Sequence, residues 1–386
     1  MKKHYFLSIF FVIAAILFSS NTFAQKKLVN KAFTWAKQGT NLDTALKALD
    51  AAANDPTTKD WAKTYFTYAL VYQAIGNSQV PEFKSLEQYP FIKAFDNFKK
   101  TYYMNGGSAF KTDIDFALTS LPSILANLGV EAYSADNFGD AFKYFEKSYE
   151  VTLMPVFGGG IDTILIYNTA LMAFRNNDWD NSIKYYTKSI EINYGEGDTY
   201  ALLAEAYKGK GDNESYVKAL KDGFDKYPSN QNLIGGIINY YILEVENTDE
   251  AFKYIEVALE KDPSNAYFHS AKGHLYDKTG KLEDAKASYN KAIELKPDLF
   301  EAYYNLGVIY YNEGVNLTEE ANNIKDNKKY EAAKIIADKK FEESLPYIEK
   351  AYELHPEDRS IANTLSNLYY RLKMIDKYEE IMKKLE

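Results

Sequence analysis

Few residues of this sequence have the types and spacings that acid–base or metal chemistry needs. There is no cysteine, and one of the four histidines, His4, lies within the first 24 residues. His269 and His274 are five residues apart, which is a poor spacing for two ligands of one metal on a helix. Neither the HExxH pattern of zinc proteases nor the GxSxG pattern of serine hydrolases occurs. The sequence therefore predicts no catalytic residue, no metal site and no cofactor.

The run Gly158-Gly159-Gly160 is the stretch that could be taken for a phosphate-binding loop. Such a loop follows a strand and leads into a Lys-Ser or Lys-Thr pair at the start of a helix. Here no strand is predicted before the glycines, and no such pair follows them. We therefore interpret these residues as a flexible connector.

The charge balance argues against two classes of partner. The chain carries 45 basic and 54 acidic residues, a net charge of −9. Acidic proteins are poorly suited to bind nucleic acid or an anionic membrane surface. A charged fraction of 26% with 16% aromatic residues is typical of a globular chain and not of a disordered one.

The element that would position any binding residue is seen most clearly over residues 266–297. Small and aromatic side chains fall there at fixed offsets: Gly273, Tyr276, Gly280, Ala285, Tyr289 and Ala292. The apolar residues from Leu282 onward keep the i, i+3, i+7 spacing of one helix face. This pattern predicts two antiparallel helices with an apolar stripe. One such hairpin cannot bury its own stripe, so it must stack on copies of itself.

Glycine and proline predict where the two helices turn and stop. Gly280 tolerates a left-handed backbone in the turn, and Pro297 disfavours helix at Lys296, so the second helix should stop there. Gly273 and Ala285 have almost no side chain, and we expect them to let the two helix backbones approach closely. Prolines recur in phase at Pro228, Pro263 and Pro297, with spacings of 35 and 34 residues.

The same pattern extends along the whole chain. We expect units that start near residues 27, 62, 122, 163, 197, 232, 266, 300 and 359. A longer connection is expected over residues 105–121, with room for a short helix. Asp298 and Glu301 have the spacing of a capping box at the start of the eighth unit. The predicted fold is all-α, a solenoid of about nine helical hairpins.

The eighth unit is longer than the others. Its closing proline, Pro356, comes 59 residues after Pro297. The extra residues have high helix propensity and a short polar break near 323–327, which predicts one extended hairpin over residues 312–340. A disordered insert is the alternative, but Tyr330, Ile336 and Phe341 favour order.

The spacing over residues 266–297 resembles a tetratricopeptide (TPR) repeat, in which pairs of helices recur about every 34 residues. His269 and Lys272 depart from the pattern, at positions where the family prefers Trp and Leu. The whole chain resembles exported TPR proteins of the Bacteroidetes type, through VNKAFTWAKQGTNLDTALKALDAA, TKDWAKTYFTYALVYQAIG and YYNEGVNLTEEANNIKDNKKYEAAK. The biochemical role of that group is not established. The resemblance therefore implies a right-handed superhelix and a location in the cell envelope, and names no partner.

Residues 1–24 have the form of a secretory signal peptide. Lys2 and Lys3 precede an apolar run of 14 residues, and the small residue Ala24 marks the expected cleavage site. A membrane anchor is the alternative, but the run is shorter than the roughly 20 residues that a spanning helix needs. Cleavage would leave residues 25–386 as the repeat domain, with a net charge of −11. With no cysteine to lipidate, we expect a soluble, exported, periplasmic protein without a lipid anchor.

The resemblance also implies where a partner would bind, because the first helix of each TPR pair lines the concave face. Applied here, it selects Asn127, Tyr133, Tyr167, Asn168, Phe174, Tyr240, His274, Tyr304, Asn305 and Tyr311. Amides can donate and accept hydrogen bonds to a peptide backbone, and tyrosines offer flat contact area. The alternative is that the aromatic residues fill seams between helices, since the chain has 34 tyrosines and six Tyr-Tyr pairs. The Lys and Asn clamp that some TPR domains use for a C-terminal carboxylate is not assembled.

Three functional hypotheses follow. The first is a non-catalytic scaffold in the cell envelope that binds another envelope protein or a peptide segment in the concave groove. The second is a structural subunit of an envelope assembly that docks through its ends or through the 312–340 hairpin. The third is an enzyme of unrecognised type, which would need a buried polar pocket with strongly perturbed acids. None of the three involves nucleic acid or membrane insertion.

Overall fold

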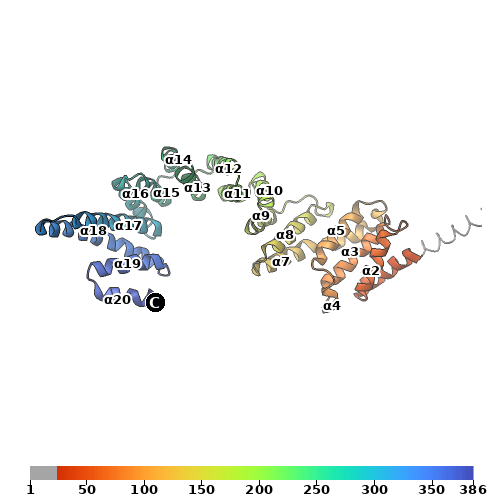
Figure 1. The fold of residues 1–386 in the computed structure, drawn as a ribbon. Helices are drawn as coiled ribbons and strands as arrows, with labels where there is room; N and C mark the ends of the chain where they lie inside the picture. Colours follow the sequence, from red (N-terminus) through yellow and green to blue (C-terminus); the bar gives the residue numbers. More distant parts are fainter. Residues whose placement is uncertain (1–23, 386) are drawn as a thin grey trace, which may run out of the picture. The chain divides into compact units, whose positions relative to one another are not determined.

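The computed structural model describes residues 24–385, and these residues form helices and connecting turns without a strand. The predicted signal segment lies outside the described residues, apart from Ala24. The described residues divide into two compact units, residues 24–194 (unit 1) and residues 195–385 (unit 2). Figure 1 shows that the helices of each unit follow one another in sequence order as antiparallel pairs.

Unit 1 contains four helix pairs. They are residues 24–38 with α2 (Leu42–Asn54), α3 (Ala62–Asn77) with α5 (Pro90–Tyr103), α7 (Leu121–Ser134) with α8 (Phe138–Thr152), and α9 (Thr163–Arg175) with α10 (Trp179–Glu191). Short elements lie between them: α4 (Pro81–Lys84), a 3-10 turn (Gly107–Phe110), α6 (Lys111–Leu118) and a second 3-10 turn (Pro155–Phe157). The connection over residues 105–121 therefore contains a short helix, as expected.

Unit 2 contains five helix pairs. They are α11 (Glu196–Lys210) with α12 (Asn213–Lys226), α13 (Gln231–Asn239) with α14 (Thr248–Lys261), α15 (Ala266–Lys278) with α16 (Leu282–Leu295), α17 (Phe300–Asn322) with α18 (Asn327–Leu354), and α19 (Arg359–Arg371) with α20 (Ile375–Leu385). A π-helical turn, Tyr240–Glu244, continues α13. The helices α17 and α18 have 23 and 28 residues, whereas α15 and α16 have 13 and 14.

The predicted all-α repeat of about nine hairpins is confirmed over residues 24–385. Contacts in unit 1 pass from α2 to α3 and from α8 to α9, and in unit 2 from α14 to α15, from α16 to α17 and from α18 to α19. Each pair thus covers the apolar stripe of the next pair in its unit. The right-handed twist of the superhelix stays a prediction. Within residues 24–385, none of the helices combines the length and the apolar character that crossing a membrane requires.

The predicted turn and stop signals of the 266–297 hairpin are confirmed. Gly280 has a left-handed backbone with φ of +72°, a conformation that glycine adopts without strain. The second helix, α16, ends at Leu295, and Lys296 is extended before Pro297. The capping box predicted for α17 is wrong: its N-cap is Leu299, and no side chain caps the helix. Asp298 therefore lies one residue too early to cap α17.

Gly273 serves a different purpose from the one expected. A Cβ atom built on Gly273 would lie 2.9 Å from the ring of Tyr289 on α16. The missing side chain therefore makes room for an aromatic ring of the second helix. Gly76 with Phe91 and Gly129 with Phe145 repeat the arrangement in unit 1, at 2.6 and 2.9 Å. In each of these pairs, a glycine of the first helix makes room for an aromatic ring of the second helix.

Candidate partner-binding site

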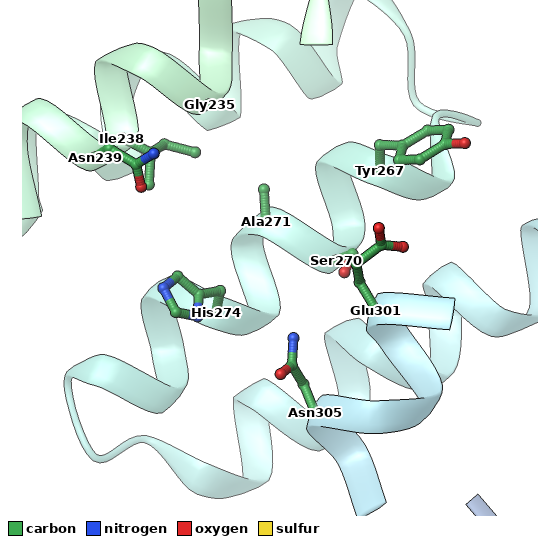
Figure 2. Close-up of a pocket in the computed structure, with 9 residues that line it drawn as sticks. All are labelled: Gly235, Ile238, Asn239, Tyr267, Ser270, Ala271, His274, Glu301 and Asn305. Carbon is green, nitrogen blue, oxygen red and sulfur yellow. The ribbon is translucent and has the colours of Figure 1, made fainter. Parts of the chain in front are cut away.

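The first helices of three consecutive pairs in unit 2 border a pocket of about 260 Å³. We call it the unit 2 pocket. It is lined by α13, α15 and α17, and Figure 2 shows how their side chains surround it. The lining residues are Gly235, Ile238, Asn239, Tyr267, Ser270, Ala271, His274, Glu301 and Asn305.

Small residues create the space of the unit 2 pocket. A Cβ atom at Gly235 would meet no other atom within 4 Å. On the facing helix, Ala271 has only a methyl group and Ser270 is buried. Longer side chains at these three positions would fill the gap between α13 and α15.

Asn305 connects the unit 2 pocket to the core below it. The ring of Tyr289, which lies against Gly273, is fully buried, and its hydroxyl makes no hydrogen bond of normal geometry within residues 24–385. Burial raises the pKa of the Tyr289 hydroxyl, and the nearby Asn305 amide offsets part of that rise. The hydroxyl therefore stays protonated, and the Asn305 amide lies between a buried polar atom and the pocket.

His274 contributes an uncharged imidazole to the unit 2 pocket at neutral pH. Burial lowers the pKa of this histidine, and the ammonium of Lys278 lowers it further, while Asp277 opposes the change. A neutral imidazole has one nitrogen that donates a hydrogen bond and one that accepts. His274 therefore resembles the amides of Asn239 and Asn305 in offering both functions.

One end of the unit 2 pocket has charged groups of both signs. The ammonium of Lys296 donates a hydrogen bond to the Tyr267 hydroxyl and lies 4.5 Å from the ring centroid. Glu301 is exposed at the start of α17, and no ion pair to it is found within residues 24–385. The pocket thus has neutral donors and acceptors in its interior, with the Glu301 carboxylate and the Lys296 ammonium at its edge.

The described acids with lowered pKa values lie away from the unit 2 pocket. Four described acids have pKa values below their ordinary range: Asp55, Asp140, Asp212 and Glu283. None of the four lines the unit 2 pocket. In the part of the chain that the structure describes, no group of three or more acidic or histidine side chains could hold a metal ion.

Of the ten side chains that the sequence selected, His274 and Asn305 meet in the unit 2 pocket. Tyr304 and Tyr311 are on the same helix as Asn305 but pack into the seam with α18 and α19. The Tyr304 ring is stacked on Phe300 with centroids 5.8 Å apart, and Tyr311 meets Phe341 edge to face at 5.4 Å. Both tyrosines are half-buried, and a partner-binding role for them stays a prediction.

Tyr240 also packs in a seam between helices. The adjacent Asn239 lines the unit 2 pocket in its stead. The Tyr240 ring is 6.1 Å from Tyr216 and 5.2 Å from Tyr241. A signal for Asn239 was present in the sequence. Pro228 and Pro263 are 35 residues apart, so the equivalent of His274 one repeat earlier is residue 239 and not residue 240.

The other five selected residues belong to unit 1. Asn127 and Tyr133 are exposed on α7, and Asn168 is half-buried on α9. Tyr167 contacts the rings of Tyr186 and Tyr194, and Phe174 contacts Trp179 and Tyr186. A partner-binding role for these five residues stays a prediction.

Sequence reasoning missed seven residues of the unit 2 pocket: Gly235, Ile238, Asn239, Tyr267, Ser270, Ala271 and Glu301. Several are small or apolar, and such residues carry no chemical signal by themselves. Their common feature is position, since all lie on first helices. Only the packing of those helices shows which of them face the same space.

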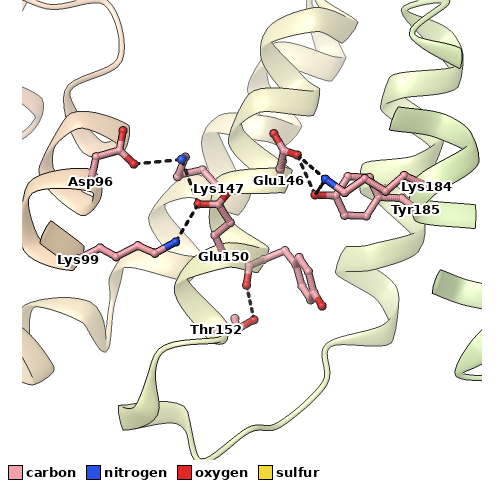
Figure 3. Close-up of polar contacts among 9 residues, drawn as sticks. Asp96, Lys99, Glu146, Lys147, Glu150, Thr152, Lys184 and Tyr185 are labelled. Carbon is pink, nitrogen blue, oxygen red and sulfur yellow. Dashed lines mark hydrogen bonds and ion pairs between the residues drawn. The ribbon is translucent and has the colours of Figure 1, made fainter. Parts of the chain in front are cut away.

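A second polar cluster, on the second helices of unit 1, is structural in character (Figure 3). The ammonium of Lys147 on α8 lies 3.0 Å from Asp96 on α5 and 3.1 Å from Glu150. The Tyr185 hydroxyl on α10 donates to Glu146 on α8 at 2.8 Å. Partly exposed pairs of this kind contribute up to about 1 kcal/mol each. They join α5, α8 and α10 and fix how consecutive second helices sit against each other.

Comparison with known proteins points to one class. Residues 273–314 match the family model described as TPR repeat. The human tetratricopeptide repeat protein 6 is 22% identical over 242 residues, which cover 52% of this chain and 42% of that protein. The anaphase-promoting complex subunit CDC16 of Saccharomyces cerevisiae is 23% identical over 255 residues, covering 61% of this chain and 25% of that protein. This chain therefore spans less than half the length of either relative.

Solved structures of repeat proteins are also similar. A TPR repeats protein from Bacteroides fragilis is 22% identical, covers 64% of this chain and 98% of its own, and has a TM-score of 0.28. YrrB, described as a TPR protein with an unusual peptide-binding site, is 15% identical, with coverages of 47% and 89% and a TM-score of 0.33. The family model and the relatives support a tetratricopeptide repeat protein. The matched residues overlap the hairpin at 266–297, where the repeat pattern is clearest.

Proposed function

We propose that this protein is a non-catalytic interaction scaffold that holds a peptide or protein segment against the first helices of unit 2. The observation that carries the proposal is the unit 2 pocket, where His274 and Asn305 from consecutive first helices line the same space. Two relatives are named as subunits of the anaphase-promoting complex, which supports a role in protein assembly.

The chemistry of the unit 2 pocket fits an extended segment of chain. A peptide backbone presents N–H and C=O groups in alternation, and each needs a partner when it leaves water. Asn239, His274 and Asn305 can each donate and accept, so they can satisfy either group. The small residues Gly235 and Ala271 let a backbone approach closely.

We extend the proposal to the cell envelope. The support is the form of residues 1–24, which is typical of a secretory signal, and the resemblance to exported TPR proteins. The partner would then be another envelope protein or a peptide segment of one.

A second candidate is docking through the α17–α18 hairpin. On α18, the side chains of Ile335 and Ile336 are 69% and 56% exposed. Adjacent apolar side chains in water are typical of an interaction surface. This observation favours the structural-subunit hypothesis for the 312–340 region.

One cross-linking experiment in living cells tests both candidates. A photo-reactive residue is placed at Asn239 in the unit 2 pocket, at Ile336 on α18, or at Asn290, which is exposed on α16 outside both the pocket and the 312–340 region. We expect capture of a discrete partner at residue 239 and none at residue 290. Capture at residue 336 alone would favour the hairpin instead.

The same experiment is repeated with Asn305→Ala, and Asn290→Ala serves as the matched control. Loss of one or two hydrogen bonds costs about 1–2 kcal/mol, so Asn305→Ala should weaken capture about tenfold while Asn290→Ala leaves it unchanged. If capture at residue 239 is equal in the two variants, the unit 2 pocket is not the binding site.

A further inference from the structure

Unit 1 contains a larger pocket with different chemistry, of about 530 Å³. We call it the unit 1 pocket. It lies between the helix of residues 24–38, α3 and α6, and its apolar walls are Phe33, Phe66, Leu70, Phe116 and Ala117. Its volume is within the range of about 300–1,000 Å³ that is usual for ligand pockets. It shares no residue with the unit 2 pocket.

The helix α6 holds an aromatic side chain in water at the edge of the unit 1 pocket. Ile114 and Leu118 are fully buried and fix α6 to the core, while Phe116 between them is 80% exposed. The helix is an addition to the two-helix repeat, since it lies between the second and third pairs. A large apolar side chain displayed beside an aromatic-walled pocket is typical of a contact surface.

The Phe33 wall of the unit 1 pocket is flanked by two cations. The ammonium groups of Lys37 and Lys63 lie 4.6 and 4.9 Å from the Phe33 ring centroid. Within residues 24–385 no ion pair to either lysine is found, and Lys37 is exposed and lines the pocket. Asp113 on α6 is a lining carboxylate. An anionic ligand group would therefore be attracted to Lys37 and repelled by Asp113, which gives the ligand a preferred orientation.

We propose that the unit 1 pocket is a separate binding site for a segment of another protein that presents an aromatic side chain next to an aspartate or glutamate. The aromatic ring packs among Phe33, Phe66 and Phe116, where ring–ring contacts favour it. The adjacent carboxylate pairs with Lys37. Residues 1–23 of this chain do not have this chemistry, because they include Lys2 and Lys3 and no acidic residue.

A random peptide library displayed on phage and selected on the full chain provides the probe. The selected sequences are made as synthetic peptides, and their affinities are measured by fluorescence anisotropy. We expect an aromatic residue next to Asp or Glu to be enriched.

Phe116→Ala and Lys37→Glu should each weaken binding of the selected peptides at least about tenfold. Both side chains are exposed, so the variants should fold, which thermal melting followed by circular dichroism verifies.

Matched controls exist on the same unit. Tyr103 is 64% exposed and Lys47 is exposed, and neither lines the unit 1 pocket. Tyr103→Ala and Lys47→Glu should leave affinity within about twofold of wild type. Asn305→Ala, in the unit 2 pocket, should also have no effect.

Each other outcome overturns the proposal. Recovery of no binding peptide, or of peptides without the aromatic–acidic pair, removes the assigned ligand class. Equal binding to wild type, Phe116→Ala and Lys37→Glu places the peptides elsewhere, and loss with Asn305→Ala places them in the unit 2 pocket. Self-association of the chain that Phe116→Ala abolishes would make a second copy the occupant in place of a different protein.

Discussion

His274 is the residue of the unit 2 pocket whose charge should respond to mild acid. Burial lowers its pKa from the ordinary value of 6.5. Between the lowered value and the ordinary one, the unfolded chain binds a proton that the folded chain does not. The contribution of His274 to stability is therefore lost as the pH falls through that window. Protonation would also place a positive charge near the ammonium of Lys278, which opposes it.

We predict that His274→Gln makes the free energy of unfolding less sensitive to acid. Urea unfolding at pH 7 and at pH 5 should show a smaller loss for the variant than for wild type. His355→Gln is the control, because His355 lies outside the pocket against Phe300. An equal pH dependence in His274→Gln and wild type would show that the imidazole is not held in its neutral form by the fold.

At the scale of elements, the contact between a first-helix glycine and a second-helix ring organises each hairpin. In the α15–α16 pair, Gly273 accommodates Tyr289, and Tyr289 in turn lies below Asn305. The packing inside one hairpin therefore also positions a side chain of the next. Gly235 on α13 differs, because its surroundings are open.

We predict opposite effects of the same substitution at these two glycines. Gly273→Ala places a Cβ 2.9 Å from the Tyr289 ring, and overpacking of this kind costs about 1–3 kcal/mol. Gly235→Ala meets no atom within 4 Å and should stabilise α13 by about 0.5–1 kcal/mol through helix propensity. Urea unfolding measures both. A stable Gly273→Ala variant would mean that the ring of Tyr289 can shift without cost.

At the scale of the whole molecule, contacts run between helices that are near in sequence. In such a repeat protein, stability is approximately a sum of hairpin and nearest-neighbour contributions. Local opening should therefore be possible without unfolding of the entire chain. The division into two units, each with its own pocket, fits this pattern.

We predict that Gly273→Ala accelerates amide hydrogen exchange locally. Exchange should be faster in α15, α16 and α17, whose contacts include the perturbed hairpin, and unchanged in α3, α5 and α7 of unit 1. Mass spectrometry of peptic fragments measures the difference. Uniform acceleration over both units would show that the chain opens as one cooperative block.

Much of the fold could be predicted because its signals are local. The helix stop at Pro297, the turn at Gly280 and the proline spacing depend on backbone chemistry that each residue carries wherever it stands. The capping box at Asp298 failed because helix α17 begins one residue later than the spacing suggested. A capping prediction fails if the helix start is wrong by one residue. The repeat period rests on many residues, so an error of one residue does not change it.

The sequence by itself determined that this protein is a stack of helical hairpins, since the period and the apolar stripes leave no other way to bury them. Only the tertiary structure decided which side chains share a pocket. Adjacent residues on a helix point about 100° apart. Asn239 therefore lines the pocket, whereas Tyr240 packs in a seam between helices. The exposure of Phe116 likewise depends on how α6 packs, because Ile114 and Leu118 fix that helix by contacts that are remote in sequence.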